Sequence, residues 1–362
     1  MSATPETTIG DPLLLEPQWS RLLCLDALSQ VDVPAEEAAV TVDSLIDASL
    51  RGVDSHGLAL LPLYIERIRS GQIVPGRRSL ARRDDETTAL LDGQHGIGPV
   101  LACEAMDLAT EKAARYGLGA VSLLNSNYIG ALAFYAVRAC ASGMMGVCTA
   151  NATPRVAPYG GSEGLHGTNP IAYAAPMDGA APLVFDISTG HSGAKVKQAL
   201  DNGTSLPEGI ALDKEGHPTV DAQAGFDGVL LPVGGALGSG LGLLVDLLSA
   251  GLAGGRIGPE IPPHTELEEP YGCGFFALVI DPERFGGRDI FAQRVHFLAE
   301  ATRQTRPAHG VDEVRAPGDR AETEKARRQE EGIPMTQQQW QNLRSRLLDC
   351  GVTPVALPDQ PS

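Results

Sequence analysis

Two short polar segments carry the side chains best suited to chemistry in this chain of 362 residues. The first, DSHG at 54–57, places Ser55 and His56 in a loop between two predicted helices, where an imidazole can act as a general acid or base near neutral pH. The second, NSNYIG at 125–130, offers Asn127 and Tyr128 at the start of another predicted helix. Each segment also has a purely structural interpretation, because Asp, Ser and Asn are the usual caps at the start of a helix. The residues alone leave both interpretations open.

A stretch rich in glycine and proline, from Val147 to Gly240, is the second feature of interest. Glycine lets a backbone approach a ligand closely and proline fixes a loop, so this stretch suits either ligand-binding loops or tight turns in a β-rich core. Within it, His166 precedes GTNP at 167–170, which could bind an anion through its N–H groups or form an ordinary turn. The run from Gly234 to Gly242 lacks both the Lys-Ser/Thr of a phosphate-binding loop and the acidic residue that follows a dinucleotide motif.

The elements that must position these residues follow from hydrophobic periodicity and from helix start and stop signals. Helices are expected over 17–30, 35–50 and 60–70, which makes the N-terminal part a helical subdomain. Strands and helices then alternate, so we expect an α/β fold with α+β character and a mixed sheet rather than a purely parallel one. The elements expected there are strands over 87–91, 120–124, 146–150, 171–175 and 183–187, and helices over 99–116 and 129–142.

The C-terminal part is expected to add one strand and several helices. The helix over 241–252 is strongly apolar and is expected to be buried, and a strand follows over 275–280. Further helices are expected over 288–304, 322–331 and 336–350. The apolar residues expected to face inward on the helix over 288–304 are Ile290, Phe291, Val295, Phe297 and Leu298.

Composition and charge exclude several classes of partner. With 28 Lys and Arg against 45 Asp and Glu, the net charge is −17, which argues against nucleic acid or an anionic membrane surface. The six cysteines show no CxxC spacing and are expected to be reduced thiols, with no metal site. Residues 1–12 do not resemble a signal peptide, and no apolar run is expected to reach the roughly 18 residues of a membrane span, so we expect a cytoplasmic protein.

Many ordered blocks of the sequence together resemble one known family over about residues 17–351. The blocks are DSHG at 54–57, NSN at 125–127, PYGG at 158–161, GTNP at 167–170, FDIST at 185–189, LD at 212–213, LP at 231–232 and PG at 317–318. The chain is similar to the malate/L-lactate dehydrogenase family that is distinct from the Rossmann lactate dehydrogenases. That family includes ureidoglycolate, sulfolactate and diketogulonate dehydrogenases and reductases of cyclic imine carboxylates.

The resemblance implies an L-sulfolactate dehydrogenase-like fold in a homodimer. It implies a mixed-sheet NAD(P)-binding-type domain, expected over 81–254, and a discontinuous helical domain formed by 1–80 and 255–362. It also implies that His56 donates a proton with Ser55 beside it, while a nicotinamide cofactor supplies hydride. The residues it places against the cofactor are Phe185, Asp186, Ser188, Thr189, Gly318 and Asp319, and those it places against the substrate are Leu60, Asn127, Thr168 and Asn169.

Three departures from the family pattern bear on the chemistry. Leu60 stands where the family usually has an Arg, and leucine offers no guanidinium to a substrate carboxylate. Tyr128 replaces the usual His, and a phenol has an unperturbed pKa near about 10. Leu237 replaces a Lys expected beside the cofactor or substrate. In the last block Asp319 keeps an acid, but Arg320 follows where a polar or acidic residue is usual.

Two functions are therefore predicted, and a third remains open. The first is an NAD(P)H-dependent oxidoreductase that reduces a 2-oxo acid or cyclic imine in an atypical pocket, with His56 as proton donor and Tyr128 assisting. The second is a redox-neutral enzyme of a specialised pathway, a lyase, isomerase or cyclase, that has lost nicotinamide. The third is a dimeric binding partner without catalysis. The residues do not choose between NADH and NADPH, although Arg320 or His191 could meet a 2′-phosphate.

Overall fold

The computed structural model describes residues 12–357, so the expectation about a signal peptide falls largely outside the described range. The chain divides into two compact units, one formed by Met1–Arg69 with Arg320–Ser362 and the other by Ser70–Asp319. This division differs from the expected one, which assigned 255–362 to the helical domain. The difference arises because a strand at 273–280 lies inside the sheet of the second unit.

The first unit is helical, with one small two-stranded sheet that the sequence did not predict. Its helices are α1 (Pro17–Ser29), α2 (Ala35–Leu50), α3 (Leu61–Arg69), α10 (Asp319–Glu331) and α11 (Gln337–Asp349), and two single turns, η1 (Asp54–His56) and η2 (Leu58–Leu60), follow α2. Strands β1 (Leu13–Leu15) and β11 (Ile333–Met335) pair antiparallel and so join the two ends of the chain. Trp19 and Trp340 pack with ring centroids 5.7 Å apart. The predicted Thr start of the last helix is present, as Thr336 and Gln339 form a capping box.

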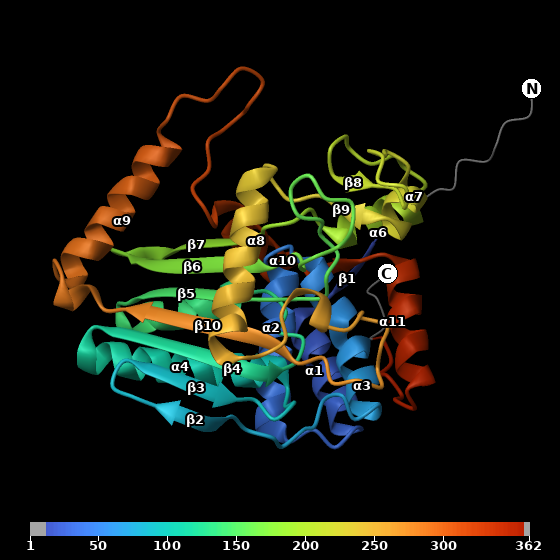
Figure 1. The fold of residues 1–362 in the computed structure, drawn as a ribbon, viewed down its shortest axis with the longest axis horizontal. Coiled ribbons are helices and arrows are strands. Elements are labelled where there is room, and N and C mark those ends of the chain that lie inside the picture. Colours follow the sequence, from blue (N-terminus) through green and yellow to red (C-terminus); the bar gives the residue numbers. More distant parts are fainter. Residues whose placement is uncertain (1–11, 358–362) are drawn as a thin grey trace, which may run out of the picture. The chain divides into compact units, whose positions relative to one another are not determined.

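The second unit is built on a seven-stranded mixed sheet in the order β2-β3-β4-β10-β5-β6-β7 (Figure 1). The strands are β2 (Leu80–Asp84), β3 (Thr88–Asp92), β4 (Leu118–Ser126), β5 (Met145–Ala150), β6 (Pro170–Met177), β7 (Ala180–Ser188) and β10 (Cys273–Ile280). Only β3 and β4 pair in parallel, because helix α4 (Gly98–Tyr116) crosses between them. The mixed α/β class that the sequence predicts is therefore confirmed.

The two faces of this sheet are covered differently. On one face, Gly119 approaches Ala109 of α4, and the thiol of Cys148 contacts the carbonyl of Leu132, just before α5 (Ala133–Ala136). On the other face, Thr149 bonds Ser249 of α8 (Ala236–Ser249) at 2.8 Å. Alternate residues of a strand point to opposite faces, so α4 and α5 cover one side and α8 the other. The helix expected over 129–142 is shorter than predicted, since a 3₁₀ segment, η3 (Val137–Ser142), follows α5.

Helices α8 and α9 (Arg288–Arg303) expose apolar side chains that the sequence placed in the core. The expectation that α8 is buried is wrong for one face, where Leu247 is 58% exposed. The expected inward face of α9 is wrong as well, because Phe297 is 60% exposed and only Val295 and Ala299 are buried. With the following turn, α8 also gives an 18-residue stretch, Ala236–Ala253, whose length and composition would suit a membrane span, contrary to expectation. A buried Asp246 and the contacts of α8 with the sheet mark it instead as part of the α/β unit.

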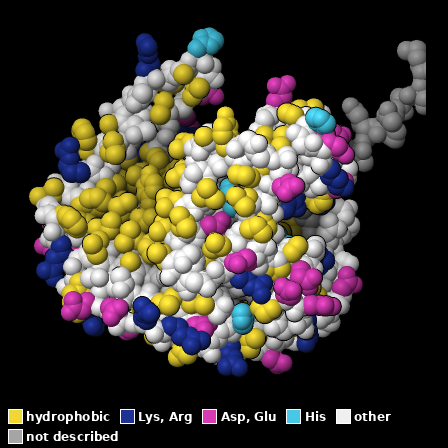
Figure 2. All heavy atoms as spheres, viewed as in Figure 1, with side chains coloured by type: hydrophobic (Ala, Val, Ile, Leu, Met, Phe, Trp, Pro, Cys, Tyr) yellow, Lys and Arg dark blue, Asp and Glu magenta, His cyan; other side chains and the backbone are white. Residues whose placement is uncertain are grey.

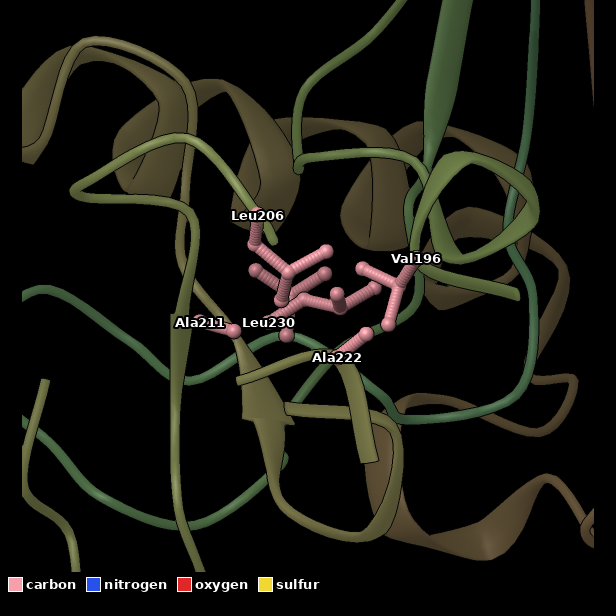
Figure 3. Packing of buried hydrophobic residues seen from close by; sticks show 6 residues of the cluster. Val196, Leu206, Ala211, Ala222 and Leu230 are labelled. Carbon is pink, nitrogen blue, oxygen red and sulfur yellow. The ribbon is translucent and has the colours of Figure 1, made fainter. Parts of the chain in front are cut away.

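A small secondary core supports the loops beside β7 (Figure 3). The residues that form it are Val156, Val196, Leu206, Ala211, Ala222 and Leu230. Four of them come from α6 (Gly193–Asp201), α7 (Ala222–Asp227) and the antiparallel pair of β8 (Ala211–Leu212) and β9 (Val229–Leu230), while Val156 and Leu206 lie in loops. Val156 also contacts the Cα position of Gly190, where an added Cβ would lie 2.4 Å from the valine side chain. This core therefore fixes the backbone that directly follows β7.

Candidate functional site

The DSHG segment of the first unit is a tight turn held by contacts within that unit. Gly57 lies so close to Ser49 that an added Cβ would meet the serine Oγ at 2.0 Å, and the same Oγ accepts from the N–H of Leu58 at 2.9 Å. Arg328 of α10 donates to both carboxylate oxygens of Asp54, at 2.5 and 3.2 Å, and to the carbonyl of Ser49 at 2.6 Å. The role of this turn is thus to present the two residues between Asp54 and Gly57.

Those two residues are Ser55 and His56, and their side chains interact directly. The Ser55 hydroxyl lies 2.9 Å from Nδ1 of His56, so a hydrogen bond between them can fix the orientation of the imidazole. Burial lowers the pKa of His56 below its ordinary value, which favours the neutral ring at pH 7. Leu60 lies one turn further on, in η2, and is half-buried. The geometry therefore gives an oriented, neutral imidazole beside an apolar side chain.

We expect Arg328→Ala to lower the free energy of unfolding by about 2–4 kcal/mol, because it leaves the Ser49 carbonyl and part of Asp54 without their charged partner. The Arg328 side chain is 8% exposed, so water replaces these bonds poorly. Urea unfolding followed by circular dichroism measures the change. Arg327→Ala is the matched control, since Arg327 is 42% exposed and its ion pairs with Glu324 and Glu331 are screened by water and contribute little. Equal effects of the two substitutions would contradict the assignment.

In the second unit, the predicted residues Thr168, Ser188 and Thr189 come together. The carbonyl of Thr168 accepts from the hydroxyls of Ser188 at 2.9 Å and Thr189 at 3.1 Å, and from the N–H of Thr189. The Thr189 hydroxyl also lies 3.0 Å from the carbonyl of Asn169. The GTNP loop and the end of β7 therefore form one rigid corner, as the resemblance implies for a ligand site.

Asn169 itself, however, has its side chain committed inside the protein. Its amide nitrogen donates to the carbonyl of Gly242 at 2.9 Å and to Asp246 at 3.0 Å, and its amide oxygen accepts from the N–H of Ala152. Asp246 accepts a second bond from Asn151. The Asn169 side chain thus joins three segments of the second unit, and its contact with substrate stays a prediction. Asp246 was not singled out from the sequence, although an acid inside an apolar helix is a recognisable signal.

Phe185 and Asp186, both predicted to bind the cofactor, point to opposite faces of β7 and have different neighbours. Phe185 stacks on Tyr173 with centroids 5.2 Å apart. Asp186 accepts from the N–H of Ala133 at 2.8 Å, at the start of α5. Because strand residues alternate in direction, a ligand at one face can touch only one of the two side chains.

Gly318 and Asp319 lie beside β7, as the resemblance implies, but Asp319 is held by the protein. Gly318 adopts a φ of 98°, and an added Cβ would meet the backbone of Val184 at 3.1 Å. Asp319 pairs with Arg303 at 2.6 Å and accepts from the N–H of Ala316, and the Arg303 guanidinium holds the pKa of this carboxyl below its usual range. Gly318 thus allows a close backbone approach, and Asp319 anchors the turn.

The start of α8 is the most glycine-dependent part of the corner. Gly235 adopts a φ of 62°, and an added Cβ on Gly238 would meet the carbonyl oxygens of Val233 at 2.2 Å and Thr189 at 2.7 Å. Leu237 lies between these glycines and is 70% exposed. Position 237, where the resemblance implies a Lys, is therefore exposed but carries an uncharged side chain.

Asn127 and Tyr128 lie on a separate loop of the second unit. Asn127 is fully buried, donates to the carbonyl of Gln72 at 3.0 Å and accepts from the N–H of Tyr128 at 2.9 Å. The Tyr128 ring is half-buried and meets the ring of His264 at a centroid distance of 6.0 Å. Asn127 therefore positions Tyr128, and Gln72 and His264 are neighbours that sequence reasoning did not identify. Among residues 12–357, no group of three or more His, Cys, Asp or Glu is arranged to hold a metal.

Comparison with known proteins decides the family. Residues 16–344 match the malate/L-lactate dehydrogenase family. The chain belongs to this family. It is 34% identical over 319 residues to L-sulfolactate dehydrogenase of Methanocaldococcus jannaschii, covering 88% of this chain and 92% of that one. It is 36% identical over 301 residues to (2R)-3-sulfolactate dehydrogenase (NADP(+)) of Chromohalobacter salexigens, covering 82% of this chain and 87% of that one.

Solved structures of the malate/L-lactate dehydrogenase family share the fold. The structure of sulfolactate dehydrogenase from Methanocaldococcus jannaschii matches with a TM-score of 0.87 at 33% identity, covering 94% of this chain and 98% of that one. Delta1-piperideine-2-carboxylate reductase from Pseudomonas syringae matches with a TM-score of 0.82 at 29% identity, covering 92% of this chain and 99% of that one. The predicted family and fold are confirmed, and as a member of this family the chain is a dehydrogenase or reductase.

Proposed function

We propose that this protein is an NAD(P)H-dependent reductase of a 2-oxo acid or cyclic imine. The observation that carries the proposal is the DSHG turn of this family member, where Ser55 lies 2.9 Å from an imidazole whose pKa burial lowers. A neutral His oriented in this way accepts the proton of a substrate hydroxyl during oxidation and returns it during reduction. The names of two relatives, a sulfolactate dehydrogenase and a piperideine-2-carboxylate reductase, support these two substrate classes.

The residues of the second unit fit a nicotinamide nucleotide. The corner formed by Thr168, Ser188 and Thr189 continues into α6, whose N-terminus is capped by Ser192 and is suited to an anion. Gly238 near the start of α8 packs directly on the carbonyls of Val233 and Thr189, which leaves no room for a Cβ, so this turn lies close against the corner. When bound, the nicotinamide would supply the hydride. Ser188, Thr189 and the N–H groups of this corner would hold the nucleotide.

Other residues would transfer the proton and line the substrate pocket. His56 would donate the proton, and Tyr128 would assist through its phenol. Leu60 and Leu237 stand where the resemblance implies an Arg and a Lys, so the substrate pocket would suit a larger or less anionic compound than malate.

Titration of the purified protein with NADH and NADPH by calorimetry tests the proposal. Substitutions of Leu237 provide a second test. We expect micromolar binding of one nucleotide, with reduction of members of a panel of 2-oxo acids and cyclic imines. We expect Leu237→Lys to tighten nucleotide binding about tenfold or more, because a charge-assisted bond to a phosphate is worth roughly 1.5–3 kcal/mol. Leu237→Met, which changes shape without adding charge, should leave the affinity within about twofold.

A redox-neutral reaction is the second candidate, and the exposed Leu237 favours it. This side chain is 70% exposed at the start of α8 and offers no cation to a nucleotide. If neither NADH nor NADPH binds up to millimolar concentration and Leu237→Lys restores binding, the reductase proposal fails. His56 and Tyr128 would then be tested for lyase, isomerase or cyclase activity.

A second copy of this chain is the proposed partner of the second unit. Register partners Leu278, Val147, Tyr173 and Phe185 form a half-buried apolar row across four strands, on the face that α8 covers only in part. Figure 2 shows this apolar surface in the hollow between α8 and α9. The exposed large apolar side chains on β7, α8 and α9 are Ile187, Leu237, Leu241, Leu243, Leu244, Leu247, Ile290, Phe297 and Leu298. Exposed apolar surface of this extent is typical of an interface.

The proposed location is the cytoplasm. All six cysteines are free thiols, and burial raises the pKa of Cys24 and of Cys140 to about 12. Such thiols are unreactive and typical of a reducing compartment. With a net charge of −17, the protein is expected to bind neither nucleic acid nor an anionic membrane.

A further inference from the structure

The loop over 261–271 is polar, yet buried residues and hydrogen bonds hold both of its ends in place. Ile261 is 1% exposed, and the carbonyl of Pro262 accepts from the hydroxyl of Thr153 at 2.9 Å. At its other end Tyr271 is 1% exposed, and its hydroxyl accepts from the N–H of Thr153 at 3.2 Å. Thr153 therefore ties both ends of the loop to one point.

His264 belongs to this loop, and its ring contacts the rings of two tyrosines. Its ring stacks on Tyr271, with centroids 5.6 Å apart and an interplanar angle of 24°. It meets Tyr128 edge to face, with centroids 6.0 Å apart and an angle of 63°. These are the geometries that aromatic rings prefer. The buried Tyr271 thus fixes His264, and His264 contacts the ring of Tyr128.

Gln72 joins the same two loops a second time. Its side-chain amide nitrogen donates to the backbone carbonyls of Glu266 at 3.1 Å and Glu269 at 2.6 Å. The backbone carbonyl of Gln72 accepts from the Asn127 side chain at 3.0 Å. Gln72 is 4% exposed, so these bonds are sheltered from water. The loop over 261–271 and the loop that carries Tyr128 are coupled through backbone and through side chains.

We propose that His264 is a positioning residue of the active site, which orients the Tyr128 phenol for its part in proton transfer. The proposal rests on the proposed function, because it takes Tyr128 as the assisting acid. A tyrosine needs such a support, since its hydroxyl must be held in one place to replace the imidazole of relatives. The polar loop over 261–271 is then a functional part of this enzyme and not only a connection to β10.

Kinetics of five variants test the proposal in the full-length protein. We expect His264→Ala to lower kcat about five- to tenfold with KM and nucleotide affinity unchanged, the effect of losing one aromatic contact. His264→Phe keeps a ring and should remain within about twofold of the native rate. Tyr128→Phe combined with His264→Ala should be no slower than Tyr128→Phe alone, because His264 acts through the missing hydroxyl. His217→Ala, at an exposed histidine of the same unit, should change nothing.

Additive losses in the double variant, or full activity of His264→Ala, would overturn the proposal. A measurement independent of turnover separates its failure from that of the reductase function. In protein labelled with 3-fluorotyrosine, the ¹⁹F signal of Tyr128, identified by its loss in Tyr128→Phe, should shift in His264→Ala and return towards its native position in His264→Phe. An unchanged signal in His264→Ala would disprove the positioning role even if no NAD(P)H-dependent activity were found.

Discussion

Replacement of His56 with Gln should lower kcat for reduction by about 10²–10³-fold, within the usual contribution of a general acid. Glutamine keeps a polar side chain of similar reach but cannot transfer a proton. The surrounding turn depends on Asp54, Arg328 and Gly57, so it should fold unchanged. Loss of NAD(P)H absorbance with the best substrate of the panel measures the rate, and calorimetry checks that nucleotide affinity is retained.

The pH dependence of the reaction rate should report the titration of His56, which His56→Gln removes. Burial lowers its pKa, so the protonated form needed for reduction is populated only below the ordinary histidine value of about 6.5. The rate of reduction should therefore fall as pH rises through this lowered pKa. The rate of oxidation, which needs the neutral ring, should rise through the same pKa and level off near pH 7. Both transitions should be absent from His56→Gln.

Ser55→Ala is the matched control within the same turn. It removes the hydrogen bond at Nδ1 but leaves the imidazole, so we expect a loss of only about three- to tenfold, equivalent to one neutral hydrogen bond. If His56→Gln retained more than about a tenth of the native activity, His56 would not be the proton donor. The search for the donor would then move to Tyr128.

Local sequence signals predicted the helices and the position of the DSHG turn well. The amphipathic pattern of α2 and the capping box of α11 depend only on residues within a few positions, so both could be found without the structure. The alternation of strands and helices likewise predicted the mixed sheet. The resemblance to the family singled out both Thr168 and Thr189, but their direct contact is a finding of the structure.

The errors concern relations that no local pattern contains. Asp246, from a distant helix, accepts a hydrogen bond from the Asn169 amide, and no local pattern indicated this contact. Arg328, which holds Asp54, lies 274 residues further along the chain in an ordinary charged helix. Hydrophobicity also does not show whether a side chain is covered by its own chain or by another, which explains why α8 and α9 were expected to face the core.

Introducing Glu at Leu247 and at Phe297 should weaken the proposed dimer by about a hundredfold or more for each substitution. These side chains are 58% and 60% exposed on α8 and α9, the two helices beside the apolar hollow. If a second copy covers them, each glutamate would be buried without a cation, and desolvation of an unpaired charge is costly. Sedimentation velocity across a range of concentrations measures the dissociation constant.

A matched substitution tests whether a glutamate at any exposed leucine would weaken the dimer. Leu22 of α1 is 60% exposed outside the hollow, so Leu22→Glu should leave the dimer intact. Because Leu247 and Phe297 are already in water within one chain, neither glutamate should lower the unfolding temperature of the dissociated subunit. A monomeric native protein would refute the dimer. A dimer unaffected by either glutamate would mean that a different partner covers the row from Leu278 to Phe185 and the leucines of α8.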